Sequence, residues 1–221
     1  MRRGGSGRGP TAAQCIIDRV RLLLASSSPR RADLMTSAGF AFDVAPADVD
    51  ERPLPGETAE AHVIRLATAK SRAVTPAHAG TAVVAADTVV VIDGAILGKP
   101  ADDGEAAAML RMLSGRTHEV LTGVAVRRAG TERSGIECSR VTFAELTADE
   151  VAWYVASGEP RDKAGAYGVQ GLAARFVESV EGSYSNVVGL PVESAQRLLA
   201  AEGVVRAPSE AQGRPDAARA V

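Results

Sequence analysis

Between residues 83 and 92 an apolar stretch of the chain surrounds a single carboxylate. Residues 83–92 are almost all apolar and many are β-branched, with Asp87-Thr88 in their midst. This pattern predicts a buried strand. Because Asp93-Gly94 follows, the stretch is either one strand with a polar end or two strands joined by a turn at Asp93-Gly94.

A carboxylate inside an apolar strand is costly to desolvate unless it is paired, hydrogen-bonded or bound to a metal ion. Lys99 lies twelve positions after Asp87, between Gly98 and Pro100. A hairpin would bring the Asp87 carboxylate and the Lys99 ammonium to one end of a sheet. The alternative is that Asp87 is only a local cap on a strand that ends in a polar turn.

Apolar periodicity predicts further elements on both sides of this stretch. Strands are expected at residues 20–25, 40–44, 118–127, 139–145 and 174–180, and helices at residues 32–38, 58–74, 102–113, 147–157 and 192–201. Thr58 is a candidate N-cap, and Thr147 with Glu150 forms a candidate capping box. Residues 159–171 are expected to form a loop and residues 181–186 a polar turn. Strands and helices alternate early and strands pair later, which predicts an α/β fold with a mixed sheet.

The two ends of the chain differ in composition from its centre. Residues 1–20 are rich in Gly and Arg, and residues 203–221 are rich in Pro, Arg and Ala, so both are expected to be disordered. A single domain is expected over residues 21–202. The 221 residues suit one large domain or two small lobes that share a cleft.

Overall composition narrows the function classes. The hydrophobic fraction of 46% and charged fraction of 24% are typical of a globular protein. A net charge of −2 argues against a protein that mainly coats nucleic acid or anionic membrane, although the basic N-terminal segment could contact nucleic acid weakly. No apolar run approaches the ~20 residues of a membrane span, and no signal peptide is recognisable. Cys15 and Cys138 are expected to be free thiols in a reducing compartment, which predicts the cytoplasm.

Ser26-Ser27-Ser28-Pro29-Arg30-Arg31 stands where a strand leads into a helix. Backbone N–H groups, hydroxyl groups and the positive end of a helix favour an anion at such a junction, and the two arginines add forked donors suited to phosphate. The alternative is a serine N-cap with solvated arginines.

Carboxylates and lysines offer a second set of candidates. Asp48, Asp50, Glu51 and Asp87 carry the oxygen ligands that a hard divalent cation prefers, although the first three are also typical of an exposed acidic loop. Lysine is scarce, and Lys70, Lys99 and Lys163 are candidate phosphate partners or solvated side chains. Lys99 and Lys163 lie in Gly- and Pro-containing loops, which favours the phosphate interpretation.

The three histidines, His62, His78 and His118, share no spacing typical of a metal site or catalytic triad. His118 is expected to make a structural hydrogen bond. Tyr167 and Tyr184 could stack on a base or pack in the core and loops.

Seven segments of the chain occur in the order of a known family: residues 24–31 (LASSSPRR), 49–51 (VDE), 86–90 (ADTVV), 96–100 (ILGKP), 113–118 (LSGRTH), 158–160 with 162–171 (GEP, DKAGAYGVQG), and 182–184 with 187–191 (GSY, VVGLP). Together they resemble the Maf family of nucleoside triphosphate pyrophosphatases over about residues 22–201. The resemblance implies an elongated mixed α/β fold with a cleft between two lobes, which is similar to that of inosine triphosphatases, and a homodimer. It also implies hydrolysis of a nucleoside triphosphate to the monophosphate and pyrophosphate with Mg²⁺ or Mn²⁺.

The resemblance also assigns expected roles. Asp87 matches the catalytic carboxylate of the family and, with Glu51, a candidate metal ligand, while Glu51, Lys70 and Lys99 match its other charged cleft residues. The residues expected to bind substrate are Ser27, Arg30, Arg31, Thr88, Lys163 and Gln170. Whether Asp87 deprotonates the attacking water or holds the metal ion stays open.

Within the family, the branch that acts on dTTP and UTP is similar to this chain at Arg30, Thr88 and Gln170. The amide of Gln170 can donate to and accept from a pyrimidine edge. Two alternatives remain: a pyrophosphatase for modified or non-canonical nucleotides, and a regulator of cell division that binds nucleotide or nucleic acid.

Overall fold

The computed structural model describes residues 20–205. The expected disorder of residues 1–20 and 203–221 concerns segments that lie almost entirely outside this range. The proposed boundaries of a single domain over residues 21–202 therefore stay a prediction. Within residues 20–205, no helix is long and apolar enough to cross a membrane.

One mixed sheet of seven strands forms the centre of the molecule. The strands are β1 (Leu22–Leu24), β2 (Asp43–Val44), β3 (Ala82–Ile92), β4 (Ala95–Leu97), β5 (Thr117–Arg128), β6 (Thr131–Phe143) and β7 (Val177–Glu181). Their order is β2-β1-β3-β5-β6-β7, and β4 pairs with β3 alone. β1 is parallel to β2 and β3, whereas the other pairs are antiparallel. The predicted α/β class with a mixed sheet is confirmed.

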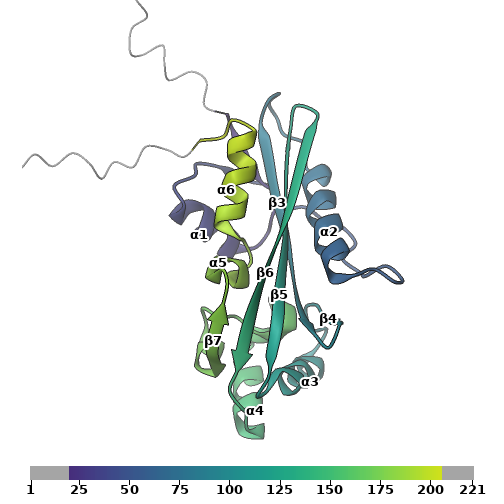
Figure 1. Cartoon of the computed structure of the whole chain (residues 1–221), viewed down its shortest axis with the longest axis vertical. Coiled ribbons are helices and arrows are strands. Elements are labelled where there is room, and N and C mark those ends of the chain that lie inside the picture. The colour runs from purple at the N-terminus through teal and green to yellow at the C-terminus, as the bar shows by residue number, and fades with distance from the viewer. Residues whose placement is uncertain (1–19, 206–221) are drawn as a thin grey trace, which may run out of the picture.

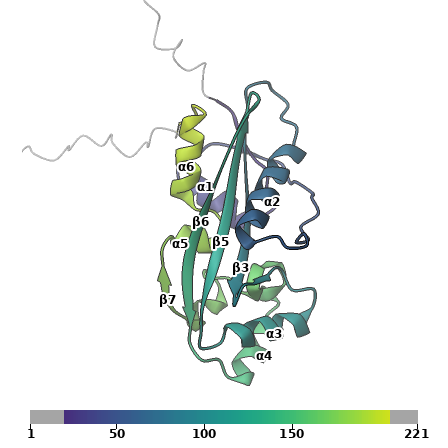
Figure 2. The ribbon, with the colours of Figure 1, turned by 45° about the vertical axis from the view of Figure 1, so that its right-hand side comes forward.

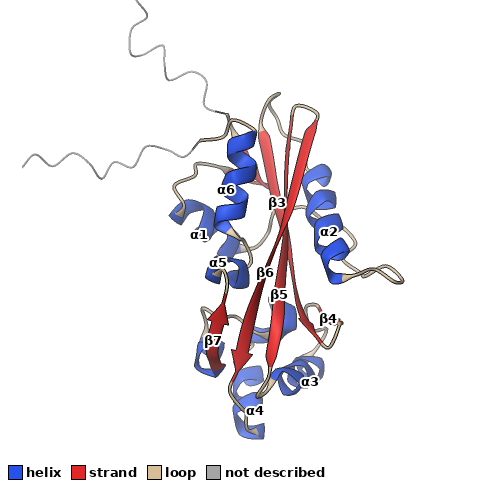
Figure 3. Cartoon of the chain, in the orientation of Figure 1, coloured by secondary structure: helices blue, strands red, loops and turns tan. Residues whose placement is uncertain are grey.

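Helices cover both faces of this sheet (Figures 1 and 3). They are α1 (Pro29–Ser37), α2 (Ala59–Ala73), α3 (Asp103–Leu113), α4 (Ala148–Ala156), α5 (Tyr184–Val188) and α6 (Val192–Ala201), with 3-10 helices η2 (Glu159–Asp162), η3 (Ala164–Ala166) and η4 (Leu172–Phe176). α2 lies on one side of the long strands and α1 and α6 lie on the other, while α3 and α4 lie at the lower end in Figure 1. The turned view in Figure 2 shows the same elongated shape.

Two large apolar clusters form the core of two lobes. One includes Leu110, Phe143 and Tyr154, near α3 and α4. The other includes Met35 and Leu199, near α1 and α6. β3 contributes buried side chains to both clusters, so the two lobes share a continuous strand. The elongated two-lobed form implied by the resemblance is therefore present.

Local signals in the sequence account for several elements. The Thr58 side chain accepts a hydrogen bond from Ala61 N at 3.2 Å and begins α2. Thr147 and Glu150 form the predicted capping box of α4. Asp93 and Gly94 have φ angles of 51° and 77°, which a two-residue hairpin loop requires, and they join β3 to β4. The two-strand interpretation of residues 83–100 is confirmed.

Other boundaries differ from the prediction. α1 begins at Pro29 instead of residue 32, because proline is well suited to the first turn of a helix. β6 begins at Thr131 instead of residue 139, since its first half is mostly polar and exposed and gives no apolar alternation. β2 has only two residues. Residues 174–176 belong to η4, and residues 184–188 form α5 instead of a polar turn, with Ser183 accepting from Asn186 N.

Candidate active site

A cavity of about 700 Å³ lies between the two lobes and is lined by segments from both. These are the β1–α1 loop, the loop before α2, the middle of β3, Gly98-Lys99 and the stretch from Arg161 to Gln170. The lining includes the ten residues to which the family resemblance assigned roles: Asp87, Glu51, Lys70, Lys99, Ser27, Arg30, Arg31, Thr88, Lys163 and Gln170. All three lysines of the chain are among them. Their individual roles stay predictions.

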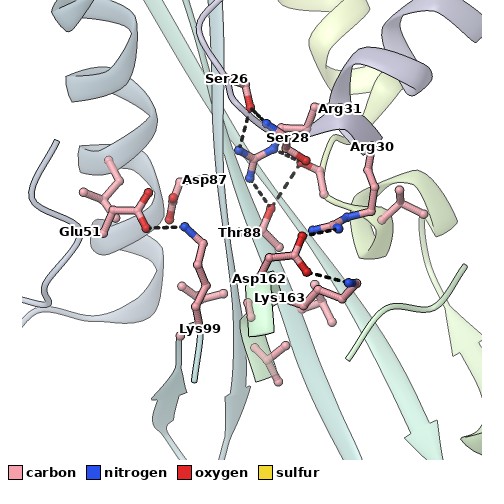
Figure 4. Close-up of a pocket in the computed structure, with 18 of the residues that line it drawn as sticks. Ser26, Ser28, Arg30, Arg31, Glu51, Asp87, Thr88, Lys99, Asp162 and Lys163 are labelled. Carbon is pink, nitrogen blue, oxygen red and sulfur yellow. Dashed lines mark hydrogen bonds and ion pairs between the residues drawn. The ribbon is translucent and has the colours of Figure 1, made fainter. Parts of the chain in front are cut away.

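Four of these side chains form a line of alternating charge. Lys70 Nζ lies 2.6 Å from Asp87 Oδ1 and 2.6 Å from Glu51 Oε1. Lys99 Nζ lies 2.7 Å from Glu51 Oε2, the contact drawn in Figure 4. The buried Asp87 is thus paired instead of acting as a turn cap. Its direct partner is Lys70 of α2, and Lys99 joins the line only through Glu51.

The lysines hold Glu51 in its ionised form. Partial burial of Glu51 opposes ionisation, but hydrogen bonds from Lys70 and Lys99 outweigh it and lower the pKa of Glu51 from 4.5 to about 2. Glu51 therefore carries a full negative charge at neutral pH. The line presents two carboxylates and two ammonium groups to the cavity.

Arg31 is fixed against the opposite wall of the cavity. Its Nε donates to Gly189 O at 2.8 Å and its Nη2 donates to Thr88 Oγ1 at 3.2 Å. Thr88 Oγ1 in turn lies 2.9 Å from Thr122 Oγ1. Burial lowers the pKa of Arg31, and the negative charges of Asp87 and Glu51 oppose that shift. The guanidinium stays charged at neutral pH and has a fixed orientation.

Arg30 reaches from α1 to the other lobe. Its Nη1 lies 3.1 Å from Asp162 Oδ2, and Lys163 Nζ lies 2.7 Å from Asp162 Oδ1 (Figure 4). Burial of Asp162 is outweighed by the hydrogen bonds from Lys163 and Arg30, which lower the pKa of its carboxyl group. One carboxylate thus joins two cations that come from the two lobes.

Gln170 lies at the exposed edge of the cavity, in the segment that follows η3. The buried Tyr167 anchors the start of this segment, because its hydroxyl lies 2.8 Å from Nε2 of the buried His118. The predicted structural hydrogen bond of His118 is confirmed. Tyr167 packs edge-on against Phe143 in the core.

Of the three carboxylates that line the cavity, Glu51 and Asp87 meet at Lys70, whereas Asp162 lies against Arg30 and Lys163. Asp48 is exposed, and Asp50 is paired with Arg52 at 2.6 Å, so these two are not part of the pair. Within residues 20–205, no three His, Cys, Asp or Glu side chains are grouped closely enough to hold a metal ion. Two carboxylates suit a hard divalent cation whose other ligands are phosphate oxygens and water. The donor set therefore fits an ion that binds together with a phosphate-bearing ligand.

Sequence reasoning missed several contributors to the cavity, among them His62, Gly189 and Asp162. His62 lines it from α2, with Nδ1 3.0 Å from Glu57 Oε2. Its position eight residues before Lys70 places both on one helix face, a signal that was present in the sequence. Gly189 contributes a backbone carbonyl, which no side-chain pattern reveals. Asp162 is next to Lys163 in the predicted loop, but its link to Arg30 depends on the fold.

Comparisons with known proteins identify a family model and several relatives that match this chain. Residues 21–202, which include every residue that lines the cavity, match a family model described as Maf-like protein. A dTTP/UTP pyrophosphatase from Anaeromyxobacter dehalogenans (strain 2CP-C) is 52% identical over 187 residues, covering 83% of this chain and 94% of that protein. Another from Symbiobacterium thermophilum is 50% identical over 179 residues, covering 81% and 92%. A solved HAM1 protein from Coxiella burnetii aligns with a TM-score of 0.42 and 16% identity over 84% of this chain and 98% of that chain.

Proposed function

The chain belongs to the Maf-like protein family, and on that basis we propose that it hydrolyses dTTP and UTP to the nucleoside monophosphate and pyrophosphate. The observation that carries the proposal is the cavity itself, which gathers all three lysines, Arg30 and Arg31 around three acidic side chains, Glu51, Asp87 and Asp162. Such a site suits a polyanion whose hydrolysis needs a positioned carboxylate. Relatives that carry the dTTP/UTP pyrophosphatase name are about half identical to this chain.

The cationic groups bind the triphosphate. Arg31 has a fixed position and presents a planar guanidinium, which suits two phosphate oxygens at once. The N–H groups at the start of α1 add partial positive charge close to Ser27 and Arg30. Lys99 and Lys163 offset charge on the phosphates and favour pyrophosphate as the leaving group.

Asp87 acts on the attacking water. Oδ1 of Asp87 accepts the bond from Lys70, which fixes the plane of the carboxylate. A water held by Asp87 attacks the α-phosphorus: its oxygen forms a new P–O bond, its proton passes to the carboxylate, and the bond from the α-phosphorus to the bridging oxygen breaks. Pyrophosphate leaves with that oxygen. A Mg²⁺ or Mn²⁺ ion held by Glu51 and Asp87 would supply further charge compensation on the phosphates.

Gln170 recognises the base. It is exposed at the edge of the cavity, where its amide can both donate and accept a hydrogen bond. A pyrimidine edge that offers a carbonyl next to an N–H group matches this pair. The enzyme is expected to act in the cytoplasm, in keeping with the free thiol of Cys138. It is also expected to be a homodimer, as the family resemblance implies.

A pyrophosphate-release screen tests this function. The full chain with Mg²⁺ or Mn²⁺ is expected to release pyrophosphate from dTTP and UTP faster than from purine triphosphates. Faster release from methylated or otherwise modified triphosphates would favour the alternative role in removing non-canonical nucleotides. Absence of release, together with salt-sensitive binding to single- or double-stranded nucleic acid, would favour the regulatory alternative.

A further inference from the structure

We infer that Glu159 is a positioning residue for base selection, because it holds in place the short segment that carries Gln170. This inference rests on the proposed dTTP and UTP pyrophosphatase function. Glu159 begins η2 and lies outside the cavity lining, so it acts through the segment that runs from Gly168 to Leu172.

Both carboxylate oxygens of Glu159 are used. Oε1 accepts the hydroxyl of Tyr154 at 2.9 Å, and Oε2 accepts the backbone N–H of Leu172 at 2.9 Å. The Tyr154 hydroxyl also accepts the backbone N–H of Gly168 at 3.3 Å. The Glu159–Tyr154 pair therefore fastens both ends of a segment of which Gln170 forms the middle.

Two glycines allow this close contact. A Cβ atom added to Gly171 would collide with both oxygens of Glu159, and one added to Gly168 would lie 2.7 Å from Cε of Lys163. The carboxylate therefore lies directly against the backbone of the segment. Gly171 N also donates to Gly168 O at 3.0 Å, which closes a tight turn around Gln170.

Tyr154 is a rigid intermediary. It is fully buried in the lobe that contains α3 and α4. Burial and the hydrogen bond to Glu159 both raise the pKa of the Tyr154 hydroxyl, so this group stays a neutral donor. A neutral hydroxyl donates to Glu159 and accepts from Gly168 at the same time. The backbone carbonyl of Glu159 also accepts Lys163 Nζ at 2.7 Å. Glu159 thus connects Gln170 and Lys163, the two substrate-binding candidates of this lobe.

Glu159→Gln tests the inference, since an amide replaces one acceptor with a donor and cannot accept from both Tyr154 and Leu172. The full chain is assayed with dTTP, UTP, dCTP and dATP. For dTTP and UTP we expect KM to rise about tenfold, while kcat changes less than about threefold. The preference over dCTP and dATP is expected to fall by a similar factor. Tyr154→Phe, which keeps the carboxylate, is expected to shift the same ratio more weakly.

Glu150→Gln is the matched control. Glu150 lies on the neighbouring α4 and closes a capping box with Thr147, so its loss lowers stability without touching the segment that carries Gln170. Its substrate ratios are expected to equal those of the unmodified protein.

A double-mutant cycle with Gln170→Ala completes the test. If Glu159 acts through Gln170, Glu159→Gln adds less than twofold to KM in the Gln170→Ala background. Unchanged ratios in Glu159→Gln, an equal loss of kcat for every substrate, or fully additive effects with Gln170→Ala would each overturn the inference. If the unmodified protein itself lacks a preference for dTTP and UTP, the proposed function fails instead, which is a separate outcome.

Discussion

Lys70 and Asp87 form a buried ion pair with 2.6 Å between Nζ and Oδ1, and each side chain is only 8% exposed. Burial of two charges is costly in free energy. The cost is offset because each charge of the pair compensates the other and because Glu51 supplies a second acceptor for Lys70. Removal of one partner leaves an uncompensated charge in the interior. The pair joins α2 to β3 at the point where the sequence predicted chemistry.

Lys70→Met is expected to lower the free energy of unfolding by about 3–5 kcal/mol, because Asp87 loses its partner. Urea unfolding at pH 7 measures the loss, and adding Asp87→Asn in the same chain should restore a large part of it. Arg72→Met is the control on the same helix, since Arg72 makes an exposed ion pair with Glu132. A Lys70→Met protein as stable as the Arg72→Met protein would contradict the account of the buried pair.

Asp87→Asn is expected to fold and to lose at least about 100-fold in kcat, the scale of a lost general base. Steady-state pyrophosphate release measures the change. Asp93→Asn is the control at the end of the same strand, where Asp93 forms an exposed pair with Arg116. Partial recovery of Asp87→Asn at high Mn²⁺ would assign Asp87 to holding the ion, and no recovery would assign it to the water. An active variant would remove both roles.

Substitutions of Thr88 and of Gln170 are expected to change different kinetic parameters. Thr88→Val removes the acceptor of Arg31 Nη2, so KM should rise for every triphosphate by a similar factor. Gln170→Glu replaces the amide donor with an acceptor, so the ratio of kcat/KM between dTTP and dCTP should change. A panel of four triphosphates separates the two patterns. A change in base preference in Thr88→Val would show that Thr88 itself selects the base.

Asp162 pairs with Arg30 and Lys163, the cations proposed to bind phosphate, so Asp162→Asn is expected to lower KM for dTTP by about two- to fivefold. The effect should shrink as salt is added, because the groups are partly exposed. Asp93→Asn, which removes an exposed pair with Arg116 outside the cavity, is the control. A higher KM in Asp162→Asn would mean that this carboxylate helps substrate binding by holding the lobes together.

His118 is expected to make the free energy of unfolding decrease at acid pH. Burial lowers the pKa of His118 from 6.5 to about 4, so the unfolded chain binds more protons than the folded one between these values. Stability is fully present above pH 6.5 and decreases as the pH falls to about 4, by up to about 3 kcal/mol.

Urea unfolding from pH 7 to pH 4 measures this dependence. His118→Gln should flatten the slope in that window, whereas substitution of the exposed His78 should not. Glu51 titrates in the folded protein near pH 2, so its contribution is lost mainly below pH 4.5 and affects only the acid end of the window. An unchanged slope in His118→Gln would show that another group controls the loss.

The elements that have short-range signals in the sequence could be predicted. Thr58, Thr147 with Glu150, and Asp93-Gly94 each have a short-range capping or turn role, and each was placed correctly. The first half of β6 and all of α5 were missed, because β6 depends on pairing with β5 and α5 depends on packing against β5 and β6. Polar strands and helices of one turn have little intrinsic pattern.

The sequence predicted which candidate residues line the cavity, but it did not predict which of these side chains contact one another. Chain distance suggested that Asp87 would meet Lys99, whereas the fold places Lys70 of α2 against it and leaves Lys99 on Glu51. Asp162 and Glu159 were visible only as loop residues. Their contacts with Arg30 and Leu172 join segments that no sequence spacing relates.

β3 runs through both lobes of the molecule, and Asp87 is at the midpoint of this strand. Ala86 belongs to the cluster packed against α1 and α6, and Val90 belongs to the cluster packed against α3 and α4. Any flexing of one lobe against the other must therefore bend this strand close to its acidic residue. Asp87 therefore lies on the strand that the two cores share, whereas Arg30 of α1 and Asp162 of η2 join the lobes through a separate contact.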